Sequence, residues 1–125
     1  MSQTGVTPKS LGDQAEDRAL AHLQRQGLRL ECRNYRLAGG PQLRGAEIDL
    51  VLRDRDGTLV FVEVRARRSD SHGGAASSIT ATKQRRIARA AQHYLMRLPV
   101  LPPCRFDVVS IDGDALTWLR AAFTA

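Results

Sequence analysis

The sequence predicts a single α/β domain with the element order α-β-β-β-α-β-β. Two observations predict it: segments of helical period lie at residues 11–26 and 82–98, and segments of two-residue alternation lie between and after them. A chain of 125 residues can bury one hydrophobic core, and the sequence shows no repeat, heptad pattern or second domain. We therefore expect residues 10–125 to form one domain and residues 1–9 to form a flexible tail.

The first predicted helix spans residues 11–26. Ser10 precedes it and can cap its N-terminus, and Asp13 three residues later completes a capping-box pattern. Gly27 follows the last turn and is a residue that readily ends a helix. These signals at the two ends predict the helix independently of its apolar stripe.

Glu16 falls near the centre of that apolar stripe, where a carboxylate faces the sheet instead of water. A buried acid needs a partner. One interpretation is that its side chain reaches an arginine at the flank of the helix, such as Arg33 or Arg36. The other is that Glu16 belongs to a functional acidic cluster, and the helix by itself leaves both open.

Alternation of apolar and polar residues predicts the strands. They span residues 28–37, 46–53 and 58–66, and an Asp-Gly turn joins two further strands, the second of them short, within residues 104–119. Residues 67–78 form a polar, Gly-rich loop. Thr80 or Thr82 caps the second helix, which Pro99 ends.

Burial selects the register between the strands 46–53 and 58–66. A three-residue loop with Gly57 in the left-handed conformation pairs Asp54 with Thr58 and separates apolar from polar residues. A two-residue turn would mix them on both faces. The pairs expected on the apolar face are Ile48 with Val64, Leu50 with Val62 and Leu52 with Val60. The pairs expected on the other face are Val51 with Phe61, Asp49 with Glu63 and Glu47 with Arg65.

Asp49 and Glu63 thus become neighbours on a half-buried face, where two like charges cost stability. Such a pair is tolerable if it shares a proton or holds a divalent cation. Two carboxylates, the backbone carbonyl of Val64 and water are ligands that suit Mg²⁺ or Mn²⁺. The alternative is a solvated face on which the acids pair with Arg53 and Arg65.

The formal net charge of +6 favours a polyanionic partner, nucleic acid before membrane. Lys83 continues the apolar stripe of the second helix into its first turn, which aims its ammonium toward the carboxylates. The alternative is a lysine whose stem covers apolar surface at a helix end. The opposite side of that helix is either a phosphate-contact face or an ordinary solvated one, and its arginines are Arg85, Arg86, Arg89 and Arg97.

Nothing in the sequence predicts a membrane or secreted protein. No run approaches the roughly 18 apolar residues that a membrane span needs, and the first ten residues lack an apolar stretch. Cys32 and Cys104 lie outside metal or redox spacing and indicate reduced, partly buried thiols. We expect a cytoplasmic protein that does not bind membranes.

Five segments together resemble the YraN family of bacterial nuclease-like proteins, which is related to Holliday-junction resolvases. They are GDQAEDRALAHLQRQGL, GAEIDLV, FVEVRAR, TKQRR and CRFDVVSI. The resemblance covers residues 10–123 and implies the restriction-endonuclease-like fold, with a mixed central sheet of about five strands flanked by helices. It also implies the PD-(D/E)xK superfamily, with DNA, including branched or flapped DNA, as the partner. It leaves a homodimer open.

Carried over by position, Asp49 is the first acid of the superfamily motif and Glu63 the second. Glu16 matches the acid in the first helix of the resolvase branch, and Arg65 stands where the superfamily has a lysine. Arginine stays protonated, so it cannot act as a base, although it can stabilise charge on a phosphate. Lys83 is the candidate to replace the missing lysine.

Two functions follow from these residues. The first is a Mg²⁺-dependent DNA phosphodiesterase whose catalytic residues are Glu16, Asp49, Glu63, Arg65 and Lys83. The second is a DNA-binding or accessory module on the same fold without hydrolysis, which Arg65 favours. In either case the residues expected to contact nucleic acid are Arg67, Arg68, Arg85, Arg86 and Arg89. Asp107, within a strand, is expected to make a structural hydrogen bond.

Overall fold

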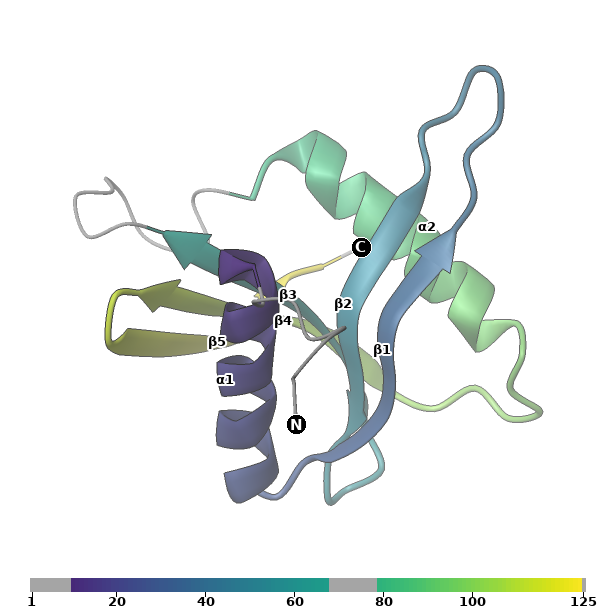
Figure 1. The fold of residues 1–125 in the computed structure, drawn as a ribbon. Helices are drawn as coiled ribbons and strands as arrows, with labels where there is room; N and C mark the ends of the chain where they lie inside the picture. Colours follow the sequence, from purple (N-terminus) through teal and green to yellow (C-terminus); the bar gives the residue numbers. More distant parts are fainter. Residues whose placement is uncertain (1–9, 68–78, 125) are drawn as a thin grey trace, which may run out of the picture.

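The computed structural model describes residues 10–67 and 79–124 (Figure 1). The elements are α1 (Leu11–Arg25), β1 (Arg29–Leu37), β2 (Ala46–Arg53), β3 (Leu59–Arg67), α2 (Ala81–Leu95), β4 (Cys104–Asp112) and β5 (Ala115–Phe123). This order is the predicted one. The expected tail of residues 1–9 and most of the expected Gly-rich loop lie outside the described residues.

The strands form one mixed sheet in the order β1-β2-β3-β4-β5. β3 and β4 run parallel, joined through α2, and the other neighbouring strands are antiparallel. This α/β arrangement with a five-stranded mixed sheet is the nuclease-like fold expected from the sequence. β5 has nine residues and is longer than the predicted short strand.

The predicted caps hold both helices. The Ser10 hydroxyl accepts a hydrogen bond of 3.1 Å from the Asp13 backbone N–H, and Gly27, just past the end of α1, has a φ of +101°. Thr80, the first of the two proposed caps, accepts a bond of 3.1 Å from the backbone N–H of Lys83. α2 ends at Leu95, before the predicted proline, because the chain tightens into turns there.

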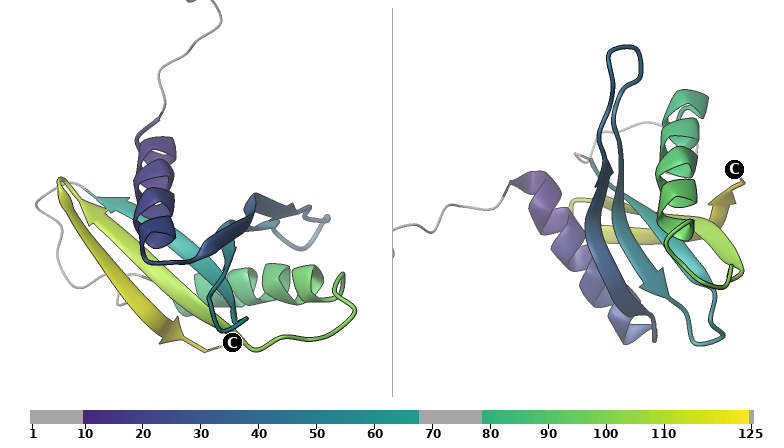
Figure 2. Two further views of the ribbon diagram at one scale, coloured as in Figure 1. Left: turned by 90° about the horizontal axis from the view of Figure 1, so that it is seen from below. Right: turned by 90° about the vertical axis from the view of Figure 1, so that its right-hand side faces the viewer.

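Helices pack on both faces of the sheet, so the expectation of a single buried face was wrong (Figure 2). The cluster under α1 includes Ala19, Leu23, Leu50, Leu52, Val60 and Val62. The cluster under α2 includes Ile48, Val51, Phe61, Ile87, Ala91 and Tyr94. Val51 and Phe61 were placed on a half-buried face, but they are 0% and 1% exposed because α2 covers them.

The predicted register between β2 and β3 is confirmed near the turn. Leu50 pairs with Val62 and Leu52 with Val60, the Asp54 N–H donates to the Thr58 carbonyl over 2.8 Å, and Gly57 has a φ of +90°. The ladder between the two strands ends at Leu50 and Val62. Beyond that point β2 stays paired with β1, and β3 stays paired with β4.

We call the place where β2 and β3 separate the fork. Past it, β1 and β2 continue as a two-stranded ribbon, and such ribbons twist more strongly than wide sheets. Ile48 therefore packs in the α2 cluster, so its predicted pairing with Val64 is wrong. Glu47 lies opposite Arg36 of β1 instead of the predicted Arg65. Its Oε1 is 3.5 Å from Arg36 Nε.

Asp107 makes the structural hydrogen bonds that the sequence suggested. It is 0% exposed and accepts bonds from Arg105 Nε, Trp118 Nε1 and the Ala121 N–H. Arg105 also donates to Asp54 over 3.0 Å, so the network connects β4 and β5 to the β2–β3 turn.

Both cysteines are free, as expected. Cys32 is partly buried, but Cys104 is exposed at the start of β4, contrary to the expectation. Neither helix in the described ranges combines the length and the apolar character that crossing a membrane requires.

Candidate functional site

Asp49 lies at the fork and takes the place of the missing strand pairing. Its Oδ2 accepts a hydrogen bond of 2.8 Å from the backbone N–H of Val64. A strand residue that loses its neighbour needs another acceptor for its N–H group. The side chain of Asp49 supplies that acceptor and is held next to Glu63, the residue before Val64.

Burial and the neighbouring carboxylate of Glu63 raise the pKa of Asp49 from 3.8 to about 8, in spite of the hydrogen bond from Val64. Glu63 is itself only 7% exposed. A half-buried carboxyl group beside a buried one is harder to ionise, which favours the protonated form of Asp49. The predicted proximity of Asp49 and Glu63 is confirmed.

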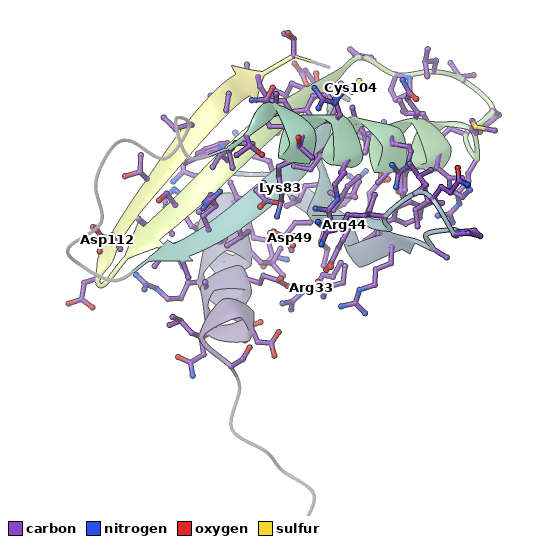
Figure 3. The ribbon with its side chains drawn as sticks, turned by 90° about the horizontal axis from the view of Figure 1, so that it is seen from above. Arg33, Arg44, Asp49, Lys83, Cys104 and Asp112 are labelled. Atoms are coloured by element: carbon purple, nitrogen blue, oxygen red, sulfur yellow. The ribbon has the colours of Figure 1, made fainter. Side chains whose placement is uncertain are left out.

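Lys83 reaches the pair from α2, as its place in the apolar stripe of that helix suggested. Its Nζ lies 3.1 Å from Oε2 of Glu63. Figure 3 shows Lys83 and Asp49 between α1 and α2, whereas Cys104 and Asp112 lie away from them. The Thr80 cap fixes the first turn of α2 and so places Lys83 at the fork.

Glu16 approaches the same place from α1. Its Oε1 lies 3.5 Å from the guanidinium of Arg33, which was one of the two arginines proposed as its partner. Burial raises the pKa of Glu16 even though Arg33 and Asn34 stabilise its charged form. Glu16 also contributes to the raised pKa of Asp49, so it belongs electrostatically to the cluster while it pairs with an arginine.

Asn34 is a site residue that sequence reasoning missed. It lies on β1 across from Asp49, between the Arg33–Leu50 and Tyr35–Ile48 pairs, with a φ of +53°. Its amide group, oriented to donate, bridges Glu16 Oε1 at 3.3 Å and Glu47 Oε2 at 2.9 Å. The only signal in the sequence is an asparagine within a strand, where it is uncommon but tolerates the left-handed conformation.

The structure separates the predicted arginines. Arg65 lies two residues after Glu63 on β3 and across from Ser110, and the backbone of Arg67 lies across from Asp112. Arg68 lies outside the described residues. Arg85 is exposed and donates to Thr82 over 3.3 Å.

Arg86 and Arg89 do not form the outward face that was one interpretation of α2. Arg86 Nε donates to the Gly45 carbonyl over 3.2 Å, and Arg89 donates to the Arg44 carbonyl. Both side chains are half-buried and fasten the base of the β1–β2 hairpin to α2. Arg97 instead lies over the rings of Tyr35 and Tyr94.

Residues 15–111, which include all these acids and Lys83, match the family model described as "Uncharacterised protein family UPF0102". The chain belongs to the UPF0102 family. This is also the YraN family that the sequence motifs resemble.

Members of the UPF0102 family align with nearly the whole chain. A UPF0102 protein of Methylibium petroleiphilum is 68% identical over 120 residues, covering 96% of this chain and 98% of that protein. One of Paracidovorax citrulli is 64% identical over 96% of this chain and 87% of its own. One of Cupriavidus taiwanensis is 61% identical over 91% of this chain and 82% of its own.

The acidic pair of this UPF0102 chain fits a hydrated Mg²⁺ ion. Mg²⁺ is usually held by one or two carboxylates and keeps several waters. Asp49 and Glu63 are two such groups, and the raised pKa of Asp49 reflects burial and the neighbouring charge of Glu63, which a cation would offset. Within residues 10–67 and 79–124 no cluster of three or more Asp, Glu, His or Cys side chains is arranged to hold a metal. A cation here would therefore depend on water and the Val64 carbonyl for its other ligands.

Proposed function

We propose that this UPF0102 protein is a Mg²⁺-dependent DNA phosphodiesterase that acts on branched or flapped DNA. The observation that carries the proposal is the pair of half-buried Asp49 and buried Glu63, with the Lys83 ammonium 3.1 Å from Glu63 Oε2. Acids and a lysine that converge from three elements at a break in a sheet are unusual for a purely structural cluster. The fold and the YraN resemblance point to the same chemistry.

Asp49 and Glu63 would hold the cation, with the Val64 carbonyl as a third protein ligand. A bound Mg²⁺ lowers the pKa of a water molecule and stabilises charge that develops on a phosphate. Asp49 would give up its proton when the cation binds, because only the ionised carboxylate is a good ligand. Glu16 keeps the surroundings of Asp49 acidic and so supports binding of the cation.

Lys83 takes the role of the motif lysine, which this sequence replaces with Arg65 on β3. Its position beside Glu63 allows it to hold the attacking water and to hydrogen-bond a non-bridging phosphate oxygen. Arg65, which stays charged at any physiological pH, would neutralise the phosphate instead of accepting a proton. The net charge of +6 supports association with DNA. A cytoplasmic location and a homodimer stay predictions.

DNA binding without hydrolysis is the second candidate. It is favoured by the same Lys83–Glu63 ion pair, since this pair and a protonated Asp49 leave the site neutral without any cation. On this view the carboxylates stabilise the fork and the arginines bind phosphates. The two functions differ in whether the pair binds Mg²⁺.

Calorimetric titration with Mg²⁺ and Mn²⁺, followed by cleavage assays on linear, flapped and four-way DNA, separates the two functions. A nuclease binds the metal and cuts, and Asp49→Asn or Glu63→Gln lowers both metal affinity and rate at least tenfold while DNA affinity persists. Asp114→Asn, in the exposed β4–β5 turn, is the control for loss of one acid. Absence of metal binding and of cleavage by the unaltered protein would leave DNA binding as the function.

A further inference from the structure

The β1–β2 hairpin projects beyond the body of the protein (Figures 1 and 2). At its tip the Gly40 N–H donates to the Leu43 carbonyl over 2.8 Å, and the Leu43 N–H donates back over 3.3 Å. A Cβ atom on Gly39 would lie 2.5 Å from the Leu43 carbonyl oxygen and 2.6 Å from the Gly45 nitrogen. The two sides of the hairpin therefore meet too closely for any residue but glycine at position 39. This close approach defines the shape of the hairpin.

The same hairpin is fastened to the helix that carries Lys83. Arg86 and Arg89 of α2 donate to the carbonyl groups of Gly45 and Arg44 at its base. Lys83 lies one turn before Arg86 on α2. The hairpin and the acidic pair thus hold a fixed position relative to each other.

A hollow of about 600 Å³ lies between the hairpin base and α2. Its lining includes the side chains of Arg36, Arg44, Arg86 and Glu47, and we call it the arginine hollow. Its three arginines outnumber its one acid, Glu47, which pairs with Arg36 over 3.5 Å. Guanidinium groups match phosphate oxygens in geometry and charge, so the hollow suits a nucleic-acid backbone next to the acidic pair.

Leu43 lies at the tip of the hairpin, beyond the hollow, and is 54% exposed. A backbone that occupies the hollow would run along the hairpin and bring its bases to this side chain. Apolar side chains of this size are used by DNA-binding proteins as wedges that separate stacked bases. Stacking is weakest at a branch point, where a wedge costs least.

We propose that the hairpin recognises branched DNA by inserting Leu43 at the branch point while the arginine hollow binds the adjacent backbone. This inference builds on the proposed function and names its substrate feature. Leu43 precedes Asp49 by six residues, a span of about 20 Å in an extended strand. A DNA strand advances about 3.4 Å per nucleotide, so the cut falls about six nucleotides from the branch.

Fluorescence of 2-aminopurine placed at the branch of a flapped duplex tests the wedge, because this base brightens when it unstacks. EDTA keeps the DNA intact. We expect the unaltered protein to raise the fluorescence at least twofold at saturation and Leu43→Ser to abolish most of that rise. Leu101→Ser, a matched change at a residue 72% exposed in the α2–β4 connection, should behave as the unaltered protein.

In Mg²⁺, Leu43→Ser should lower the ratio of branched to linear cleavage about tenfold, whereas Leu101→Ser should leave that ratio unchanged. The wedge would be overturned, even if cleavage proceeds, by either of two results. One is a fluorescence rise with Leu43→Ser equal to that of the unaltered protein, and the other is an equal loss of the rise with Leu101→Ser. If no DNA is cut but the Leu43-dependent rise is seen, the hydrolytic function fails and the wedge stands. Matching thermal unfolding curves for the variants exclude misfolding.

Discussion

The carboxylate of Asp49 accepts the backbone hydrogen bond that Val64 would otherwise give to a strand. One side chain therefore does two things: it closes the end of a sheet ladder and it completes an acidic pair with Glu63. A neutral asparagine can accept the same hydrogen bond but cannot complete the acidic pair. This difference separates the structural role of the position from its electrostatic one.

The pH dependence of stability tests the state of Asp49 in metal-free protein. Burial and Glu63 raise its pKa to about 8 in the folded chain, against 3.8 for a free side chain. Between these values the folded state binds a proton that the unfolded state has lost, so the free energy of unfolding falls as pH rises. Asp49→Asn removes this fall in the free energy of unfolding. We therefore expect the variant to be more stable than the parent by about 2–4 kcal/mol at pH 9.

Below about pH 4 both proteins carry a neutral group at position 49, and the difference should vanish. Urea unfolding in EDTA across this range measures it. A parent protein whose stability relative to Asp49→Asn is the same at pH 4 and pH 9 would show that Asp49 is not protonated in the folded state.

Lys83 and Arg65 are distinguished by their effects on rate. Lys83→Ala should lower the rate of DNA cleavage about 100-fold with little change in DNA affinity, which is the usual effect of losing a group that stabilises charge in the transition state. Arg65→Lys should keep or raise activity, since it restores the residue of the superfamily motif. Single-turnover assays at saturating enzyme measure the rate directly.

Lys9, the other lysine, offers a matched control as Lys9→Ala. Equal losses for Lys83→Ala and Lys9→Ala would show that Lys83 contributes only charge. Loss of all activity in Arg65→Lys would instead place the essential contact at the guanidinium of Arg65.

The arginine hollow predicts which charges bind DNA. Arg36→Gln and Arg44→Gln should each weaken binding and reduce the dependence of log K on log salt by about 0.9 per lost phosphate contact. Arg25→Gln, at the exposed end of α1 and outside the lining of the hollow, removes the same charge and should do neither. Fluorescence anisotropy over a range of NaCl concentrations gives both quantities, and equal slopes for all three variants would contradict a binding role for the hollow.

Asp107 should matter to stability and not to catalysis. Asp107→Ala leaves half-buried Arg105 with only one of its two carboxylate partners, Asp54, and removes the acceptor for Trp118 and the Ala121 N–H. Breaking such a buried pair costs about 3–5 kcal/mol, which urea unfolding can measure. Asp114→Asn in the exposed turn should change stability by less than about 0.5 kcal/mol.

Local signals in the sequence were sufficient for the elements and part of the site. Ser10, Thr80 and Gly27 mark helix ends because caps act within one turn, and the turn at Gly57 sets a register that burial enforces. That register predicted Asp49 beside Glu63, and the two acids do lie close, although the ladder ends one pair earlier, at Leu50 and Val62. The helical period alone directs Lys83 toward them.

Only the tertiary structure decided where β2 leaves β3 and what that separation does. Strand twist and packing of two helices on opposite faces act between residues far apart in sequence, and no periodicity encodes them. As a result, Ile48 lies in the α2 cluster and Glu47 pairs with Arg36. The amide of Asn34 bridges Glu16 and Glu47. The sequence by itself determined which acids meet, and the packing of helices around the fork decided which partners each acid found.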